Sequence, residues 1–226
     1  MTQNPFHIIT DEQMTLWAKQ VITASDEAPG RRYILGVAGI PGSGKSTFTA
    51  QLLSFIDELR PNVTRLVPMD AYHLSNEKLK ELGLYSRKGS PDTFDAQAYI
   101  TLLQQAQLVD SKLHFPIYDR KLHATVLRDD PMTKMDEKVR IVLTEGNYLL
   151  LRKKPWNTLN HVLDHCWFLH TDPQQAERWL INRHVQGGRS AQEARQRYDY
   201  NDGPNTYEIL SNSREPDMVF SWPETV

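Results

Sequence analysis

Residues 39–46 have the types and the spacing of a loop that binds phosphate groups. The segment reads GIPGSGKS, a full match to the pattern G-x-x-x-x-G-K-[ST], and Thr47 follows it. Glycines let backbone N–H groups turn toward phosphate oxygens without a clash from Cβ atoms. A lysine at this place reaches the terminal phosphates, and the serine hydroxyl after it is a ligand for Mg²⁺. The pattern therefore predicts a site for the phosphate chain of a nucleotide.

The flanks of this loop predict the elements that hold it in place. Tyr33–Ala38 is a short apolar run typical of a buried strand, and residues 45–58 predict a helix that ends before Pro61. The N-terminus of that helix would add the positive end of its dipole. A chance glycine-rich turn is the alternative, and the flanking strand and helix disfavour it. The predicted nucleotide-binding residues are Gly39, Pro41, Gly42, Ser43, Gly44, Lys45, Ser46 and Thr47.

Two acidic residues follow predicted strands, at the edge of the sheet where ligands gather in open α/β folds. Asp70 follows the strand predicted for residues 64–69, and Glu145 follows the strand predicted for residues 138–144. Phosphoryl transfer needs a carboxylate that orients the attacking hydroxyl and accepts its proton, and it needs oxygen ligands for Mg²⁺. Asp70 suits the first task, and Glu145 with Ser46 suits the second. Either acid alone would be interpreted as a cap or a turn residue, but the adjacent loop favours a function.

Four segments follow the loop in a fixed order, namely residues 70–76 (DAYHLSN), 87–95 (RKGSPDTFD), 116–123 (PIYDRKLH) and 145–146 (EG). In these segments, and from about Arg32 to Phe220, the chain resembles the uridine kinase, phosphoribulokinase and pantothenate kinase family of P-loop kinases. PDTFD and the pattern P-x-Y-D-x-x-x-H are similar to uridine kinases, whereas RKG is nearer to pantothenate kinases. The first residue of DAYHLSN is the family's proposed catalytic base, so the resemblance implies that role for Asp70.

The resemblance also implies which side chains face the acceptor of the phosphoryl group. They are Asp92, Tyr118, Asp119 and His123, with His73 as a further candidate. Carboxylates and imidazole edges would suit the hydroxyls of a polyhydroxy acceptor. Other interpretations stay open, since Tyr118 and Phe94 could be core aromatic residues and His123 a structural histidine. Asp95 is expected to cap the helix predicted for residues 95–109.

An arginine-rich segment resembles the lid of the same family. Arg183 and Arg189 lie on either side of a glycine pair. A lid must move, which glycines allow, and it must bring positive charge to a phosphoryl group in the transition state. We therefore expect a lid over about residues 178–200 in which Arg183 and Arg189 act in catalysis together with the lysine of the loop. A solvated helix face is the alternative, and Arg195 and Arg197 are assigned to such a face.

The whole chain predicts one α/β domain. Of its 226 residues 39% are hydrophobic and 24% charged, an ordinary globular composition. Strands that alternate with helices favour a mostly parallel sheet with helices on both faces. We predict a single P-loop NTPase-type three-layer sandwich over residues 1–226, with a five-stranded, mainly parallel sheet, a helical lid and an N-terminal helix over about residues 10–26. The resemblance implies the strand order 2-3-1-4-5.

Charge, hydropathy and cysteine usage bear on partners and location. The net charge of −2 predicts no nucleic-acid partner, and the lack of a long apolar stretch predicts no membrane span. The single cysteine, Cys166, lies in an apolar run and is expected to be a buried strand residue. With no disulfide possible and no signal-peptide pattern, we expect a cytoplasmic protein. The resemblance makes a homodimer possible without support from the residues themselves.

Taken together, the residues predict an ATP- and Mg²⁺-dependent kinase that transfers the γ-phosphoryl group to a hydroxyl of a small metabolite. A sugar, a nucleoside and a pantothenate-like acceptor are not separated by any physical argument. Residues 201–205 (NDGPN) resemble a bacterial branch described as sugar kinases or pantothenate kinase-like proteins, although composition alone predicts a turn there. The alternative is a nucleotide-hydrolysing switch or regulator without an acceptor. A kinase or ATPase directed at nucleic acid is a third hypothesis, which the mild acidity disfavours.

Overall fold

The computed structural model describes residues 6–119, 122 and 124–223, and its strands alternate with helices along the chain. The strands are β1 (His7–Ile8), β2 (Tyr33–Ala38), β3 (Thr64–Pro68), β4 (Leu113–His114), β5 (Ile117–Asp119), β6 (Ala124–Val126), β7 (Lys134–Met135), β8 (Ile141–Gly146), β9 (His165–His170) and β10 (Met218–Ser221). The helices are α1 (Asp11–Asp26), α2 (Lys45–Leu59), α3 (Asn76–Glu81), α4 (Ala96–Ala106), α5 (Pro173–Gln186), α6 (Ala191–Arg197) and α7 (Gly203–Asn212).

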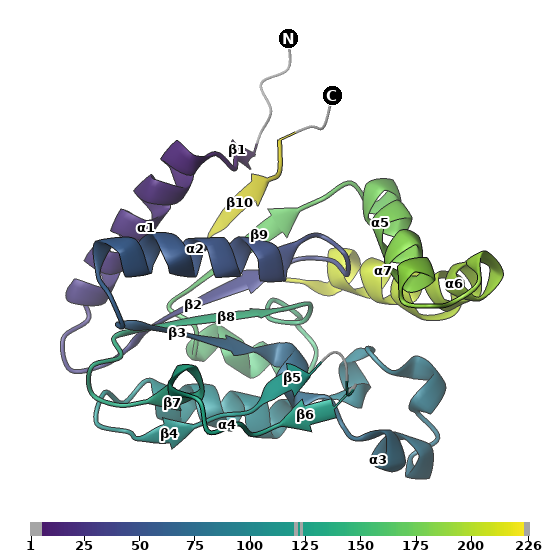
Figure 1. Ribbon diagram of the computed structural model, residues 1–226, viewed down its shortest axis with the longest axis horizontal. Helices are drawn as coiled ribbons and strands as arrows, with labels where there is room; N and C mark the ends of the chain where they lie inside the picture. Colours follow the sequence, from purple (N-terminus) through teal and green to yellow (C-terminus); the bar gives the residue numbers. More distant parts are fainter. Residues whose placement is uncertain (1–5, 120–121, 123, 224–226) are drawn as a thin grey trace.

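The central sheet is parallel and has the order β1-β10-β9-β2-β8-β3 (Figure 1). The strand order 2-3-1-4-5 implied by the resemblance is confirmed, because it corresponds to β3-β8-β2-β9-β10. The sheet nevertheless has six strands rather than the predicted five. The additional strand, β1, pairs with β10 at the edge, His7 opposite Phe220 and Ile8 opposite Ser221. A strand of two residues is too short to show a period in the sequence, which explains why the pattern missed it.

Helices cover both faces of the sheet, as predicted. In Figure 1 α1 and α2 lie above the sheet and α4 lies below it. Side chains of β2 alternate between the two layers: Tyr33, Leu35 and Val37 pack with α1 and α2, and Ile34 packs on the opposite face with α4. All six residues of β2 are buried, so this strand is central and carries the phosphate loop at its end.

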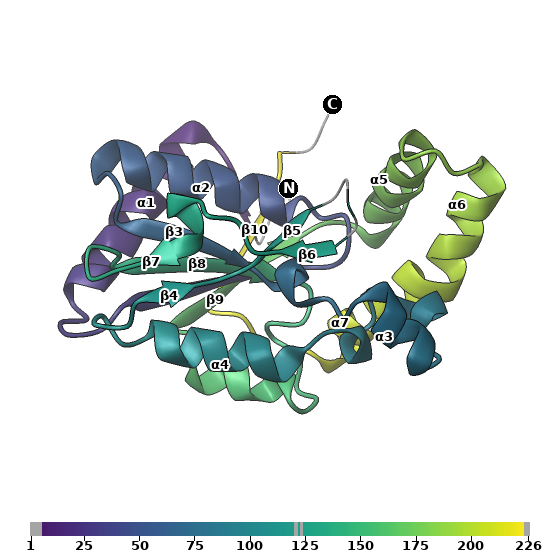
Figure 2. The ribbon, with the colours of Figure 1, turned by 60° about the horizontal axis from the view of Figure 1, so that its bottom comes forward.

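The N-terminal helix has its expected position. The segment predicted to be a lid is helical, and α5 to α7 are called the lid helices after that prediction. Thr10 caps α1, since its Oγ1 accepts a hydrogen bond from the Gln13 N–H at 3.2 Å. The lid helices α5 to α7 extend from the end of the sheet toward which β2 and β8 point, on the same side as α3 (Figure 2). They begin at Pro173 rather than near residue 178, because Asp172 caps α5 with Pro173 in its first turn.

One prediction about an irregular segment needs correction. Residues 201–205 form no loop: a π-helical turn over Tyr198–Asp202 runs into α7, whose first turn contains Pro204. Proline fits there because the first turn leaves its N–H groups without partners in any helix.

The sheet is also accompanied by two antiparallel pairs, β4 with β7 and β5 with β6. Among the described residues no helix is long and apolar enough to cross a membrane.

Candidate active site

The phosphate loop connects β2 to α2 and needs glycine at two positions. Gly42 has φ +80° and Gly44 has φ +90°, a left-handed region that other residues rarely adopt. A Cβ at Gly42 would lie 2.8 Å from Cγ of Leu180 in α5, so the loop packs against the first lid helix. On its other side Trp222 donates its indole N–H to the Ser43 carbonyl at 3.0 Å. The loop is thus a rigid, close-packed turn at the N-terminus of α2.

Lys45 places an ammonium group inside this turn. Its residue is 6% exposed, and Nζ donates to the Ile40 carbonyl at 2.8 Å. Burial lowers the pKa of Lys45 to about 8, against the opposing effect of Glu145 and Asp70 and with a further lowering by Arg183. A phosphate group in the loop would stabilise the charged form that burial disfavours. The charge of Arg183 thus acts on the ammonium group of Lys45.

Ser46 and Glu145 form the pair predicted to hold Mg²⁺. The Ser46 hydroxyl donates to Oε1 of Glu145 at 3.1 Å, and Glu145 is 7% exposed near the end of β8. The described residues contain no cluster of three or more His, Cys, Asp or Glu side chains that would cage an ion. Two oxygen donors beside a phosphate loop fit Mg²⁺, which keeps several waters and takes its other ligands from phosphates. The donor set therefore fits this ion.

Asp70 follows β3, the strand that pairs with β8 and thus with the strand of Glu145. It is half-buried in the 3₁₀ turn Met69–Tyr72, directly after β3. Its charge acts on both Lys45 and His73. The His73 ring contacts the Asp70 carbonyl through Nδ1 at 2.8 Å. Burial lowers the pKa of His73, which favours the neutral imidazole at this place.

The structure brings some of the predicted acceptor residues together. The ring of Tyr118 lies 5.1 Å from that of His73, and the ring of Phe94 lies 4.0 Å from it on the other side. Phe94 is 7% exposed and belongs to the core, as its alternative interpretation held. Asp95 caps α4 as expected, its Oδ1 accepting from the Ala98 N–H at 2.9 Å. His73, Tyr118 and Asp70 thus share one side of the site.

Two carboxylates predicted to face the acceptor form ion pairs in this structure. Asp92 is exposed and lies 3.2 Å from Nζ of Lys153, with Arg87 at 4.0 Å. Asp119 forms an ion pair with Arg128 across the β5–β6 hairpin and also accepts from the Leu122 N–H at 3.0 Å. Lys153 lies 61 residues from Asp92, and Arg128 follows a hairpin that no pattern revealed. His123 lies outside the described residues.

The arginines of the lid interact with different groups. Arg183 acts on Lys45, as described above, whereas Nη1 of Arg189 lies 3.1 Å from Nδ1 of His184. His184 in turn contacts Asp202 at 2.9 Å. Arg195 forms ion pairs with residues of its own lid, which agrees with a solvated helix face. Arg183 is thus the lid arginine whose charge acts on Lys45, whereas Arg189 contacts His184.

Arg197 and Asn201 connect the lid to the insertion after β3, a connection that the sequence did not reveal. Arg197, assigned to a solvated face, donates to the Ser86 carbonyl at 3.2 Å and also to the Lys88 carbonyl. Asn201 is 3% exposed and donates to the same Lys88 carbonyl at 3.0 Å. More than 100 residues separate these partners, so no local pattern could have shown the contact.

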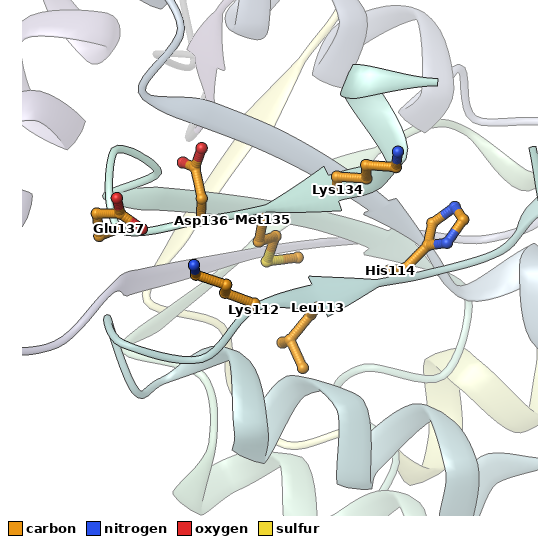
Figure 3. A pocket seen from close by; sticks show the side chains of 7 residues that line it. All are labelled: Lys112, Leu113, His114, Lys134, Met135, Asp136 and Glu137. Atoms are coloured by element: carbon orange, nitrogen blue, oxygen red, sulfur yellow. The ribbon is translucent and has the colours of Figure 1, made fainter. Parts of the chain in front are cut away.

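A hollow of about 410 Å³ lies elsewhere, between β4 and β7 (Figure 3). It contains none of the predicted site residues. Basic and acidic side chains alternate around it, so it offers no consistent charge to a ligand. Its lining consists of Lys112, Leu113, His114, Lys134, Met135, Asp136 and Glu137.

A phosphate loop with its lysine, and two acids at the ends of neighbouring parallel strands, define a P-loop protein of the nucleotide-binding α/β class. No model of a protein family matches the chain. The uncharacterized protein YggC of Escherichia coli is 34% identical over 199 residues, which are 87% of this chain and 80% of that protein. A putative uridine kinase of Schizosaccharomyces pombe is 32% identical over 197 residues, 84% of this chain and 83% of that protein.

A solved structure of another kinase is also similar to this chain over most of its length. The crystal structure of a putative fructose transport system kinase from Silicibacter sp. TM1040 has a TM-score of 0.82 and 27% identity, covering 93% of this chain and 98% of that chain. The chain belongs to the uridine kinase-like family of P-loop kinases. It is a phosphotransferase for which an alcohol group of a small molecule is the acceptor, as the sequence predicted. P-loop kinases use ATP and usually Mg²⁺.

Proposed function

We propose that the chain binds ATP through residues 39–47 and transfers its γ-phosphoryl group to a hydroxyl whose proton Asp70 accepts. One observation carries the proposal: Asp70 lies in the turn after β3, whose last residue Pro68 is opposite Glu145, and its carbonyl contacts the His73 ring at 2.8 Å. A general base must lie between the two reactants, since it contacts the hydroxyl that attacks the phosphorus. The carboxylates of Asp92 and Asp119, each in an ion pair, are placed less well for that task.

The chain's own groups account for the other requirements of phosphoryl transfer. As the bond from the acceptor oxygen to phosphorus forms and the bond to ADP breaks, negative charge accumulates on the phosphate oxygens. Lys45, the loop N–H groups and Arg183 stabilise that charge, and Asp70 takes the proton of the hydroxyl. Mg²⁺, held by Ser46 and Glu145, would supply further positive charge at the phosphates when bound.

The acceptor is a small metabolite that lies against His73 and Tyr118. Relatives bear names that refer to uridine and to fructose transport, both compatible with a hydroxyl acceptor. A ring nitrogen of His73 and the hydroxyl of Tyr118 can donate hydrogen bonds to such a molecule and accept them from it. We also propose that β1 to β10 and the lid form a single kinase domain that takes no nucleic acid as its acceptor, in agreement with the net charge of −2.

The test is an ADP-release assay with Mg²⁺-ATP against a panel of hydroxyl compounds, with Lys45→Ala as the blank. Asp70→Asn should fold and bind ATP normally but lose about 10²- to 10⁴-fold in kcat, because asparagine cannot accept the proton. Asp129→Asn is the matched control, since Asp129 is an exposed carboxylate paired with Lys134. If Asp70→Asn kept the turnover of the control on the acceptor found, Asp70 would not be the base.

A further inference from the structure

Trp222 lies against the phosphate loop although 179 positions separate it from Ser43. It follows β10, which pairs with β9 on one side and β1 on the other. Its indole Nε1–H donates to the Ser43 carbonyl at 3.0 Å. A Cβ at Gly44 would lie 2.7 Å from the same nitrogen and 3.3 Å from Cε2 of the ring. The indole therefore contacts both residues of the peptide unit that joins Ser43 to Gly44.

A second donor reaches the same carbonyl from the neighbouring strand. Thr171 follows β9 directly, is 9% exposed, and donates its hydroxyl to the Ser43 carbonyl at 3.4 Å. The first glycine of the loop also meets this strand, because a Cβ at Gly39 would lie 2.8 Å from the Leu169 carbonyl oxygen. The ends of β9 and β10, which lie side by side in the sheet (Figure 1), thus hold one side of the loop.

The geometry of the peptide unit connects these contacts to phosphate binding. The peptide bond between Ser43 and Gly44 is trans, so its C=O and N–H lie in one plane and point in opposite directions. Donors on the Ser43 carbonyl therefore turn the Gly44 N–H away from Trp222 and Thr171. A loop binds phosphate only if its N–H groups point together toward the anion. Trp222 thus fixes the direction of one N–H that phosphate oxygens would need.

This peptide unit needs such a constraint because it lies next to a glycine. Gly44 has φ +90°, and glycine changes its backbone conformation at little cost. A flip of the peptide would turn the Ser43 carbonyl oxygen toward the phosphates, where it would repel them. The flip would also break the hydrogen bond from the indole, and a lost partner is costly inside a protein. The bond therefore favours the conformation that binds before the ligand arrives.

We propose that Trp222 is a positioning residue for nucleotide binding: its indole N–H, assisted by the Thr171 hydroxyl, holds the Ser43 carbonyl so that the Gly44 N–H faces the phosphate chain. This inference rests on the proposed function, because it concerns the nucleotide bound by residues 39–47. It goes further by giving a role to the segment after β10, which lies outside the motif of the loop. The part of the ligand that depends on Trp222 is the polyphosphate chain and not the base.

The experiment removes the indole N–H and keeps an aromatic ring. Wild type and Trp222→Phe are titrated by calorimetry with Mg²⁺-ADP and with Mg²⁺-tripolyphosphate, a probe that has the phosphates and no base. We expect Kd to rise by the same factor for both probes, about three- to tenfold. An unchanged Kd for both would overturn the proposal. A rise for ADP without a rise for tripolyphosphate would also overturn it, since Trp222 would then contact the base.

Trp167→Phe is the matched control for the loss of an indole. Trp167 lies in β9, packs against Trp17 and Phe220, and belongs to the apolar cluster on which Trp222 also packs. Its replacement should lower the stability to urea and leave Kd for both probes within about twofold of wild type. If Trp167→Phe raised Kd as much as Trp222→Phe, the effect would come from the cluster as a whole and the assignment would be wrong.

Thr171 provides a second test that keeps the indole in place. Thr171→Val has the same shape without the hydroxyl and should raise Kd for both probes about two- to threefold. Thr171→Ser keeps the hydroxyl and should bind both probes like wild type. If Trp222→Phe did not fold, equal affinities of Thr171→Val and Thr171→Ser would overturn the proposal.

Failure of the kinase proposal would be recognised separately, because these titrations need no acceptor. If no compound raised ADP release but Trp222→Phe bound both probes more weakly than wild type, the positioning role would be supported and the transfer reaction would not. If wild type itself bound neither ADP nor tripolyphosphate, the phosphate site would be absent and both proposals would fail.

Discussion

The ammonium group of Lys45 is buried in the turn that should receive the phosphates, and this makes nucleotide binding depend on pH. Burial lowers its pKa from 10.5 to about 8, so part of the free protein lacks this proton at mildly alkaline pH. Phosphate oxygens next to Nζ would favour the charged form and raise the pKa again. Binding of ADP or ATP should therefore take up a proton when the pH lies between the two pKa values.

We expect this uptake to be visible by calorimetry. At about pH 8.5 the binding enthalpy should change with the ionisation enthalpy of the buffer, with a slope of up to about one proton, and at about pH 6.5 the Lys45 contribution should vanish. Lys45→Arg is the control, because a guanidinium stays protonated over this range. Equal slopes for wild type and Lys45→Arg at the higher pH would show that Lys45 already holds its proton before nucleotide binds.

At the residue scale, the sequence predicted the side chains that belong to a local motif. The loop residues and Asp70 come just after strands, Glu145 is the last but one residue of β8, and the backbone then fixes where they lie. The functions of Asp92 and Asp119 were less predictable, since each meets a cation whose position depends on the tertiary fold. The contacts of Lys88 with Tyr118 and Asn76 were not predictable either, because no spacing in the sequence indicates them.

At the scale of elements, the lid is attached to the insertion after β3 at one carbonyl. The Lys88 carbonyl accepts from Asn201 at 3.0 Å and from Arg197, which come from the π-helical turn and from α6. Such a junction can open locally while the sheet stays folded, because few groups hold it. Movement of the lid would then change the order of the segment around Lys88.

Asn201→Ala should loosen this junction. Removing a buried amide leaves the Lys88 carbonyl with one donor fewer, so amide hydrogen exchange over residues 85–90 should become about tenfold faster, with β2 and β8 unchanged. Asn212→Ala is the control, because Asn212 bonds Glu208 on the exposed side of α7. If both variants exchanged at the wild-type rate over this segment, the junction would contribute nothing to its order.

The elements themselves were predicted where a period or an apolar run is long enough to be distinctive. Tyr33–Ala38 was predicted with its observed bounds, since all its residues are buried, and α2 differs by one residue at its end. The strands of two or three residues, β1 and β4 to β7, were not predicted, because they exist through pairing with distant segments. The turn predicted for residues 201–205 is helical because tertiary packing outweighs composition there: Asn201, Asn205 and Thr206 are buried.

At the scale of the whole molecule, one buried arginine joins residues 106–111, at the end of α4, to residues 136–139, just before β8. Arg32 lies directly before β2 and is fully buried. Its guanidinium donates hydrogen bonds to a group of backbone carbonyls that would otherwise need water as a donor. The acceptors are Val139, Ala106, Leu108, Val109, Ser111 and Asp136.

Replacing Arg32 should therefore cost more stability than replacing any exposed arginine. Arg32→Met leaves these carbonyls buried without donors, and we expect a loss of about 3–5 kcal/mol in the free energy of unfolding. Arg32→Lys should recover part of it, because an ammonium group has three donors against the five of a guanidinium. The measurement is urea denaturation followed by circular dichroism.

Arg60→Met is the matched control for Arg32→Met, since Arg60 forms an exposed ion pair with Asp26 at 2.6 Å and should lose no more than about 1 kcal/mol. A large loss in the free energy of unfolding that is confined to Arg32→Met would show that the hydrogen bonds to the carbonyls stabilise the fold, rather than the charge of an arginine as such. A loss in Arg32→Met as small as in the control would mean that the surrounding segments satisfy their carbonyls in another way. Because Arg32 lies at the opposite end of β2 from the phosphate loop, nucleotide affinity of the folded fraction should stay unchanged in either case.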